Sequence, residues 1–124
     1  MSKSVLVTGG SGFIGSRLIE KLIKQDYEVT AVLRKTSKRD HLPLDKIKIV
    51  EIDLTDYQDI LDFFTLNSFD YVIHAAGITK ALKKEDYFKY NTQTTKNLIN
   101  AIQKVSWKPQ KFVFISSQAA HGTY

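Results

Sequence analysis

The sequence has 124 residues, of which 43% are hydrophobic and 25% are charged, and it contains no cysteine. These proportions are typical of one globular domain, and they exclude a disulfide-stapled scaffold and a thiolate metal site. The 18 basic and 13 acidic residues give a formal net charge of +5, but the basic residues are spread along the chain, so solvated helix faces explain most of the excess. The sequence shows neither an apolar run that could span a membrane nor a signal peptide, so we expect one cytoplasmic domain over residues 1–124 that binds no membrane.

The chain is organised around its beginning, where a short apolar strand over residues 4–8 leads into three glycines spaced three apart, Gly9, Gly12 and Gly15. Gly9 can adopt the backbone angles of a sharp strand-to-helix turn, and Gly12 leaves no Cβ between the main chain and a ligand. A helix predicted over residues 13–24 would point its free N–H groups and the positive end of its dipole at that turn. The pattern therefore predicts a cradle for the pyrophosphate of a dinucleotide, with a glycine-rich turn that binds nothing as the alternative.

After this unit the chain alternates between further strands and helices. The apolar runs predict strands over residues 28–33, 47–52, 71–73 and 112–115, and helices after Thr55 and over residues 84–103. Thr55 and Gln58 have the spacing of a capping box at the start of the first of these helices. Residues 34–45 are polar, and we expect a loop or a frayed helix there. The alternation predicts an α/β fold with a doubly wound parallel sheet, in which ligands bind at the carboxyl ends of the strands.

Five stretches of the sequence occur together in one known family. They are residues 8–15, Asp53 with Leu54, residues 74–77, Asn91 followed by Thr95, Asn97 and Leu98, and residues 112–117. In this order and at these intervals they resemble the N-terminal half of the extended short-chain dehydrogenase/reductases, also called the NAD-dependent epimerase/dehydratase family. The resemblance covers essentially the whole chain. It implies a Rossmann sheet of five strands in the order 3-2-1-4-5, truncated before the family's later strands and its C-terminal substrate-binding region.

The resemblance also implies the residues of a cofactor site. The glycines would hold the pyrophosphate, Asp53 would accept a hydrogen bond from the adenine amino group beside the Leu54 backbone, and small residues after the fourth strand would line the ribose side. The implied cofactor-binding residues are Gly9, Gly12, Phe13, Ile14, Gly15, Asp53, Leu54, Ala75, Ala76, Gly77 and Asn91. Ser117 matches the family's active-site hydroxyl residue, which hydrogen-bonds the substrate oxygen at the carbon that gains or loses a hydride. A strand-end serine that caps a turn is the alternative for Ser117.

The form of the cofactor is predicted from position 34, which lies nineteen residues after Gly15. An acidic side chain there would accept from the adenosine 2′-hydroxyl of NAD, whereas Arg34 and Lys35 can bind a 2′-phosphate through charge-assisted hydrogen bonds. We therefore predict NADP as the preferred cofactor, with NAD as the alternative and a solvated basic loop as the competing interpretation. Residues 34–39 contain no aromatic residue, which argues against a nucleic-acid partner.

The largest departure from the family concerns its general acid/base, a tyrosine in a Tyr-x-x-x-Lys helix that follows the serine strand. No such segment follows Ser117 in these 124 residues, so we expect a portion of a longer enzyme that does not catalyse the reaction alone. Thr94 stands where the family usually has glycine, and His121 where it often has tyrosine. We expect a structural role for His74 and no metal site, because no His, Asp and Glu residues have metal-ligand spacing.

The sequence thus predicts the NAD(P)-binding portion of an oxidoreductase, epimerase or dehydratase. Such an enzyme acts by hydride transfer on a carbonyl or hydroxyl group of a small molecule such as a nucleotide sugar. A non-catalytic dinucleotide-binding module is the alternative. The fifth strand would form an open sheet edge, and we expect a homo-oligomer or aggregation through that edge.

Overall fold

A computed structural model describes residues 3–9, 13–34, 42–75 and 84–115, and for residues 13–14 and 84–91 it describes the backbone alone. Its strands are β1 (Ser4–Thr8), β2 (Glu28–Leu33), β3 (Lys48–Glu51), β4 (Tyr71–Ala75) and β5 (Lys111–Ile115), and its helices are α1 (Phe13–Lys24), α2 (Tyr57–Leu66) and α3 (Lys84–Lys104). All strand pairs are parallel.

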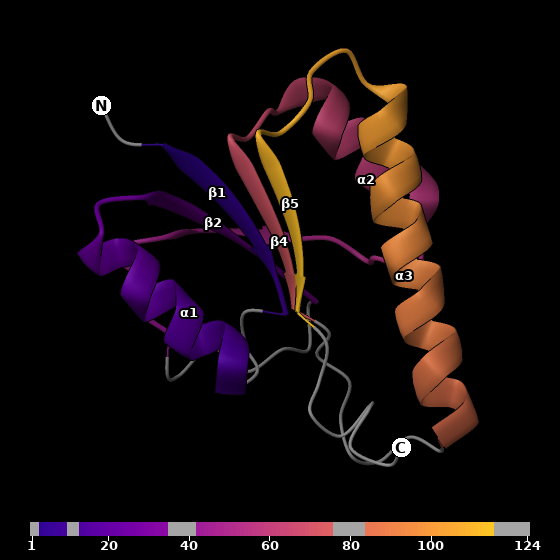
Figure 1. Cartoon of the computed structure of the whole chain (residues 1–124), viewed down its shortest axis with the longest axis horizontal. Coiled ribbons are helices and arrows are strands. Elements are labelled where there is room, and N and C mark those ends of the chain that lie inside the picture. The colour runs from indigo at the N-terminus through magenta and orange to yellow at the C-terminus, as the bar shows by residue number, and fades with distance from the viewer. Residues whose placement is uncertain (1–2, 10–12, 35–41, 76–83, 116–124) are drawn as a thin grey trace.

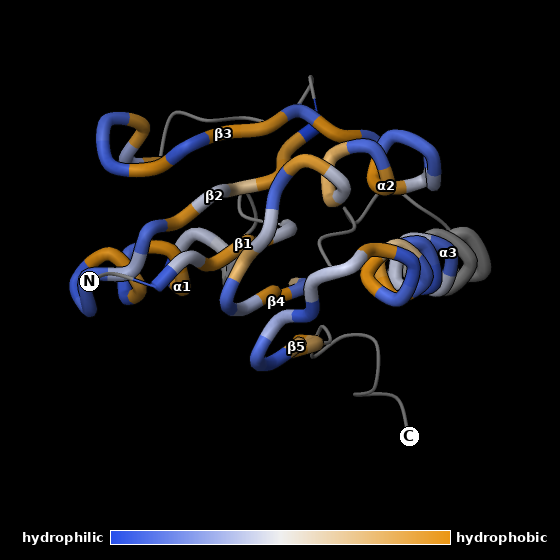
Figure 2. Tube along the Cα trace, turned by 90° about the horizontal axis from the view of Figure 1, so that it is seen from above, coloured by the Kyte–Doolittle hydropathy of each residue, from blue (hydrophilic) through white to orange (hydrophobic). Residues whose placement is uncertain are grey.

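The five strands form one sheet in the order β3-β2-β1-β4-β5, as predicted. Helix α1 covers one face of the sheet, and α2 and α3 lie together on the other face (Figure 1; Figure 2). This arrangement confirms the doubly wound α/β fold. It follows from the right-handed crossovers that connect parallel strands, which place successive helices on opposite faces once the direction of winding reverses at β1.

Two hydrophobic cores lie on the two faces of the sheet, and β1 contributes to both. Leu6 belongs to the core under α2 and α3, whereas Val5 and Val7 belong to the core under α1. Successive side chains of a strand point to opposite faces, so a central strand that is covered on both sides is mostly apolar. The four residues of β1 that follow Ser4 are all buried. This explains why polar and apolar residues do not alternate along the strand.

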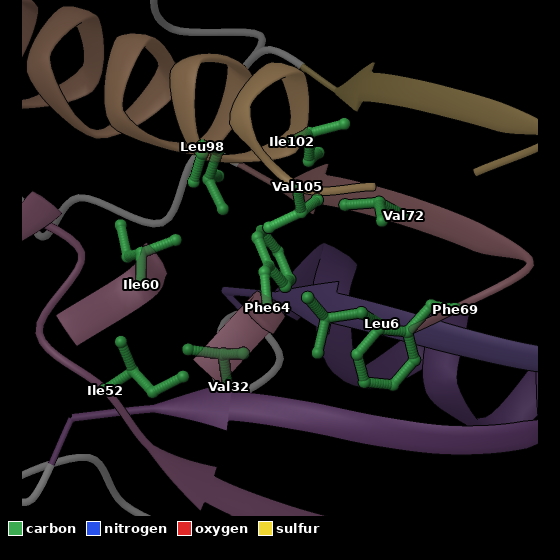
Figure 3. Packing of buried hydrophobic residues seen from close by; sticks show 11 residues of the cluster. Leu6, Val32, Ile52, Ile60, Phe64, Phe69, Val72, Leu98, Ile102 and Val105 are labelled. Carbon is green, nitrogen blue, oxygen red and sulfur yellow. The ribbon is translucent and has the colours of Figure 1, made fainter. Parts of the chain in front are cut away.

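The larger core is centred on aromatic rings from α2 and the loops beside it. Phe64 is 1% exposed, and its ring lies among side chains of the strands and of the α3 region in Figure 3. Phe69 and Trp107 contact it edge-on, at centroid distances of 6.5 and 5.4 Å. The Trp107 indole N–H donates to the backbone carbonyl of Phe64 at 2.7 Å, so the burial of this large ring leaves its polar atom paired.

The predicted capping box at the start of α2 is wrong. The N-cap is Asp56, whose carboxylate accepts from the Asp59 backbone N–H at 3.2 Å. Thr55 instead donates its hydroxyl to Asp53 at 2.6 Å, and Gln58 donates to Asp62. A carboxylate one residue closer to the helix satisfies the free N–H group and also complements the helix dipole, so Asp56 takes the position predicted for Thr55.

Other boundaries shift by a residue or two. The third strand covers residues 48–51 instead of 47–52, and the long helix ends at Lys104. Of the predicted polar loop, residues 35–41 lie outside the described part, and Pro43 begins a turn in which its carbonyl accepts from the Lys46 N–H at 2.9 Å. Among the described residues, no helix is long and apolar enough to cross a membrane.

Candidate functional site

The carboxyl ends of β1, β4 and β5 meet at one edge of the sheet, and the first turns of α3 project beyond that edge (Figure 1). The chain leaves β1 at Gly9, whose φ is +72°. A Cβ built on Gly9 would lie 2.1 Å from the backbone oxygen of Ala75 in β4. Position 9 therefore requires glycine for two reasons, the left-handed backbone and the close approach of β4, and only the first was predicted from the sequence.

Of the other two glycines of the motif, only Gly15 is among the described residues. Gly12 lies outside the described residues. Gly15 is buried in the first turn of α1, so α1 is closely packed at this position. The backbone of Phe13 and Ile14 opens α1, while their side chains and that of Asn91 in α3 lie outside the described part.

His74, near the end of β4, connects three elements. Its Nδ1 is hydrogen-bonded to Thr8 Oγ1 of β1 at 2.5 Å, and its Nε2 to Thr95 Oγ1 of α3 at 3.0 Å. The ring also lies 5.4 Å from the Phe114 ring of β5, measured between centroids. Burial lowers the pKa of His74 to about 4, so the ring is neutral at pH 7, and its contacts fit the structural role expected from the sequence.

Ala75 follows His74 at the carboxyl end of β4 and is 5% exposed. It pairs with Ile115 of β5 and faces the Gly9 turn through its backbone oxygen. Ala76 and Gly77, which were predicted to line the same cofactor, lie outside the described residues, and so does Ser117.

Asp53 follows β3 and exposes its carboxylate at the other end of the same edge. Its Oδ1 accepts from the Thr55 hydroxyl at 2.6 Å and from the Thr55 backbone N–H at 2.9 Å. These two hydrogen bonds, together with the nearby positive charge of Arg34, lower the pKa of Asp53 against the opposing effect of burial. Asp53 is therefore an ionised hydrogen-bond acceptor at neutral pH, and two bonds do not use up the acceptor positions of a carboxylate.

Arg34 is exposed directly after β2. Its charge acts on Asp53, so a cation and an anion share the corner beyond β2 and β3. The predicted partner of Arg34 in this corner, Lys35, lies outside the described residues. The structure thus brings together two residues that the sequence assigned to different parts of one adenosine, its base and its 2′-position.

One contact at this corner was missed by the sequence analysis. Asn97 of α3 is 4% exposed and donates from Nδ2 to the backbone carbonyl of Leu54 at 2.9 Å. The helical spacing of Asn97 could have indicated that it is buried. Thr94, Asn97, Leu98 and Ala101 lie on one face of α3, and all four are buried. A polar amide on a buried stripe needs a hydrogen-bond partner, which could have been sought in a neighbouring loop.

The described residues contain no group of three or more His, Asp or Glu side chains that could hold a metal ion. The candidate elements of a site in the described residues are a glycine turn before a helix, a neutral buried histidine, and two exposed residues of opposite charge. An ionised acceptor beside a cation suits a ligand that carries both an amino group and an anionic group.

The chain belongs to the NAD dependent epimerase/dehydratase family. The model of that family matches residues 5–124, which is almost the whole sequence, and this agrees with the resemblance found in the motifs. The match covers both the glycine turn and the charged corner.

Similar proteins act on two kinds of molecule. The chain is 34% identical over 113 residues to a decarboxylating sterol-4-alpha-carboxylate 3-dehydrogenase of Candida albicans, covering 86% of this chain and 32% of that enzyme. It is 33% identical over 129 residues to a UDP-N-acetyl-alpha-D-glucosaminuronate decarboxylase of Bacillus cytotoxicus, covering 98% of this chain and 39% of that enzyme. The chain thus spans 32% and 39% of the length of these two curated relatives.

Solved structures show the same architecture. The Bordetella bronchiseptica enzyme WbmG, determined in complex with NAD and UDP, superposes with a TM-score of 0.75 at 26% identity, covering 92% of this chain and 37% of that one. UDP-glucose 4-epimerase of Thermotoga maritima, determined with UDP-glucose, gives a TM-score of 0.73 at 28% identity, covering 90% and 37%.

Proposed function

We propose that this chain binds a nicotinamide dinucleotide along the carboxyl edge of its sheet. It would supply the cofactor-binding portion of an oxidoreductase, epimerase or dehydratase that works by hydride transfer. The observation that carries the proposal is the pairing of the Gly9 turn, which leads into the amino end of α1, with the ionised, exposed Asp53 at the same edge. The first suits a pyrophosphate and the second suits the adenine amino group.

The proposed contacts extend over the whole edge. Gly9, Gly12 and Gly15, with the backbone of Phe13 and Ile14, would hold the pyrophosphate at the amino end of α1. Asp53 and the Leu54 backbone would bind the adenine, and Ala75, Ala76, Gly77 and Asn91 would lie along the ribose and nicotinamide side. Ala75 at the end of β4 supports this order, because it lies beside the Gly9 turn.

The bound nicotinamide would supply a reversible acceptor for a hydride from the substrate carbon. Ser117 would donate a hydrogen bond to the substrate oxygen, which holds the reacting carbon in place and stabilises charge on that oxygen. A proton must leave the hydroxyl as the hydride leaves its carbon, and the 124 residues contain no Tyr-x-x-x-Lys segment to accept it after Ser117. We therefore propose that this chain alone binds the cofactor without turnover, as a dinucleotide-binding module does.

We propose a nucleotide sugar as the substrate class of the complete enzyme. The relatives named for UDP-sugar chemistry and the solved structures with UDP or UDP-glucose support this class, and the sterol dehydrogenase relative makes a sterol the second candidate.

The direct test of the proposed function is dinucleotide binding by the chain and by Asp53→Asn. A hydrogen bond to a charged acceptor contributes about 1.5 to 3 kcal/mol, so we expect the substitution to weaken binding of NADPH and NADH by roughly tenfold or more. Asp45→Asn is the charge-matched control, because Asp45 is exposed in the turn before β3. Binding to neither cofactor, or equal affinities for wild type and Asp53→Asn, would contradict the proposal.

We further propose that the cofactor is NADP. Arg34 supports this because its guanidinium stands at the corner next to Asp53 and can bind a 2′-phosphate. We expect NADPH to bind about tenfold more tightly than NADH, and Arg34→Gln to remove this preference while changing NADH affinity less than about threefold. Lys46→Gln, in an exposed turn, should leave the preference intact. Equal or tighter binding of NADH by the wild type would establish NAD as the cofactor instead.

We also propose that a second copy of the chain can pair with β5. Val113 and Phe114 of this strand are 41% and 47% exposed, and no other described strand pairs with its outer edge. An open, apolar edge strand is a template for pairing with another strand. Light scattering should show a dimer or larger species that Val113→Lys reduces to a monomer, whereas a monodisperse wild-type monomer would contradict this proposal.

A further inference from the structure

The third helix contributes a buried amide to the corner that holds Asp53. Asn97 is 4% exposed on the inward stripe of α3. Its Nδ2 donates to the backbone oxygen of Leu54 at 2.9 Å, although the two residues are 43 positions apart in the chain. The residue whose carbonyl is bound follows Asp53 directly.

The orientation of this amide is determined by its partners. A backbone carbonyl can only accept a hydrogen bond, so the NH₂ group of Asn97 must face Leu54. The Oδ1 atom of Asn97 accepts from Gln93 Nε2 at 2.9 Å, one helical turn earlier on α3. The two bonds together hold the Asn97 side chain in one rotamer, with its donor aimed at the loop.

The hydrogen bonds from Thr55 that hold the Asp53 carboxylate lie within the turn itself. Asp56 also donates its backbone N–H to the Asp53 carbonyl at 3.0 Å, which closes the turn internally. Such local bonds fix the shape of a turn without fixing its place relative to the rest of the molecule. The bond from Asn97 ties the turn to a helix packed on the sheet, and Leu54 adds apolar contact with the core under α2 and α3.

We propose that Asn97 is a positioning residue for the adenine end of the cofactor. Its hydrogen bond to the Leu54 carbonyl places the Asp53 carboxylate where it can accept from the adenine amino group. The inference rests on the proposed role of Asp53. It adds that α3, which lies between β4 and β5 in the chain, affects through Asn97 how well the base is recognised.

The test compares the adenine dinucleotides with their hypoxanthine analogues, in which an oxygen replaces the adenine amino group. The ratio of the two dissociation constants, measured by titrating NADPH and NADH and their analogues into the full chain, reports on recognition of the adenine edge that carries the amino group, where Asp53 would accept; the analogue also carries a hydrogen on N1. We expect a ratio of about ten for the wild type. Asn97→Leu should reduce it below about three, because the carboxylate is no longer held in place.

The chain offers a matched control in Trp107→Phe. This substitution also removes a side-chain N–H bond to a backbone carbonyl 43 residues away, the 2.7 Å bond to Phe64. This bond lies in the aromatic core and does not involve the turn that contains Asp53. It should lower the melting temperature and leave the adenine ratio unchanged. Gln93→Leu, at an exposed position, provides a second variant that should fold even where Asn97→Leu does not, and we expect it to reduce the ratio by about twofold.

The outcomes separate this inference from the proposed function. A wild-type ratio near one overturns the adenine contact of Asp53 and, with it, the role of Asn97. A wild-type ratio near ten that Asn97→Leu and Gln93→Leu both retain leaves the proposed function standing and overturns the positioning role. An equal fall of the ratio in Trp107→Phe would show that loss of stability, not loss of positioning, causes the change.

Discussion

The two ends of the carboxyl edge differ in burial and charge. Around Gly9, His74 and Ala75 the side chains and backbone are packed against one another, and both ring nitrogens of His74 are hydrogen-bonded inside the protein. Around Arg34 and Asp53 the charged groups face solvent and interact with each other. The first region is held by packing and by internal hydrogen bonds, whereas the second exposes a carboxylate whose acceptor positions are not all used by Thr55.

This difference means that the same kind of substitution has different effects at the two ends. A change near Gly9 affects the free energy of unfolding before it can affect a ligand. If the proposed function holds, a change at the exposed Asp53 affects the ligand with little effect on folding. Loss of binding in a glycine variant is therefore weak evidence for a cofactor contact, and Asp53 is the better position for testing function.

The largest effect that would sharpen this contrast is expected for Gly9→Ala. The new Cβ would meet the Ala75 backbone oxygen at 2.1 Å on a backbone with positive φ, and backbone cannot move aside as a flexible side chain can. We expect a loss of at least about 3 kcal/mol in the free energy of unfolding, measured by urea denaturation. An unchanged midpoint would show that β1 and β4 can separate here, and the buried region would then be less rigid than we describe.

An intermediate effect is expected from the buried histidine as the pH falls. The native pKa of His74 is about 4 and its ordinary value is 6.5, so between these values the unfolded chain binds a proton that the native protein does not. Stability is therefore complete above pH 6.5 and decreases as the pH falls through this window, by about 2 kcal/mol between pH 7 and pH 5.

Urea denaturation at several pH values measures this slope, and His74→Gln serves as the comparison. The variant should be less stable at pH 7, because it loses bonds to Thr8 and Thr95, but its stability should change less between pH 7 and pH 5. A variant with the same slope as the wild type would assign the pH dependence to other groups.

The smallest effect concerns the exposed corner. Hydrogen bonds from Thr55 are the largest causes of the lowered pKa of Asp53, and the charge of Arg34 is a weaker one. Thr55→Val should therefore raise the pKa of Asp53 toward its usual range by more than Arg34→Gln does, while either change costs less than about 1 kcal/mol of stability. Carboxyl-carbon NMR titration measures both, and the reverse order would mean that the charge pair controls this carboxylate.

The strand and helix positions could be predicted because they depend on local patterns, and the strand order followed from the resemblance of the motifs to one family. The glycine turn, the apolar strands and the apolar stripe of α1 can each be recognised within a short stretch of the sequence. The cap of α2 was assigned to Thr55 because a sequence pattern does not show that Asp53 lies within reach of that hydroxyl. Side-chain competition of this kind is decided by distances that only the folded turn supplies.

The candidate site could be predicted only in part for a similar reason. Asp53 and Arg34 were each singled out, but the effect of the Arg34 charge on the Asp53 carboxylate depends on β2 and β3 being neighbours in the sheet. The bond from Asn97 to Leu54 joins residues 43 positions apart, and no local pattern indicates such a partner. The tight approach of Gly9 to Ala75 likewise depends on the pairing of β1 with β4.

One stretch of α3 has a consequence for engineering this protein. Thr95 binds His74 of β4, and Asn97, two residues later, binds the carbonyl of Leu54 after β3. In the sheet these partners lie on opposite sides of β1. A chimera that takes the turn around Asp53 and Leu54 from a relative would keep an α3 matched to the old turn, so residues 93–97 should be transplanted together with it.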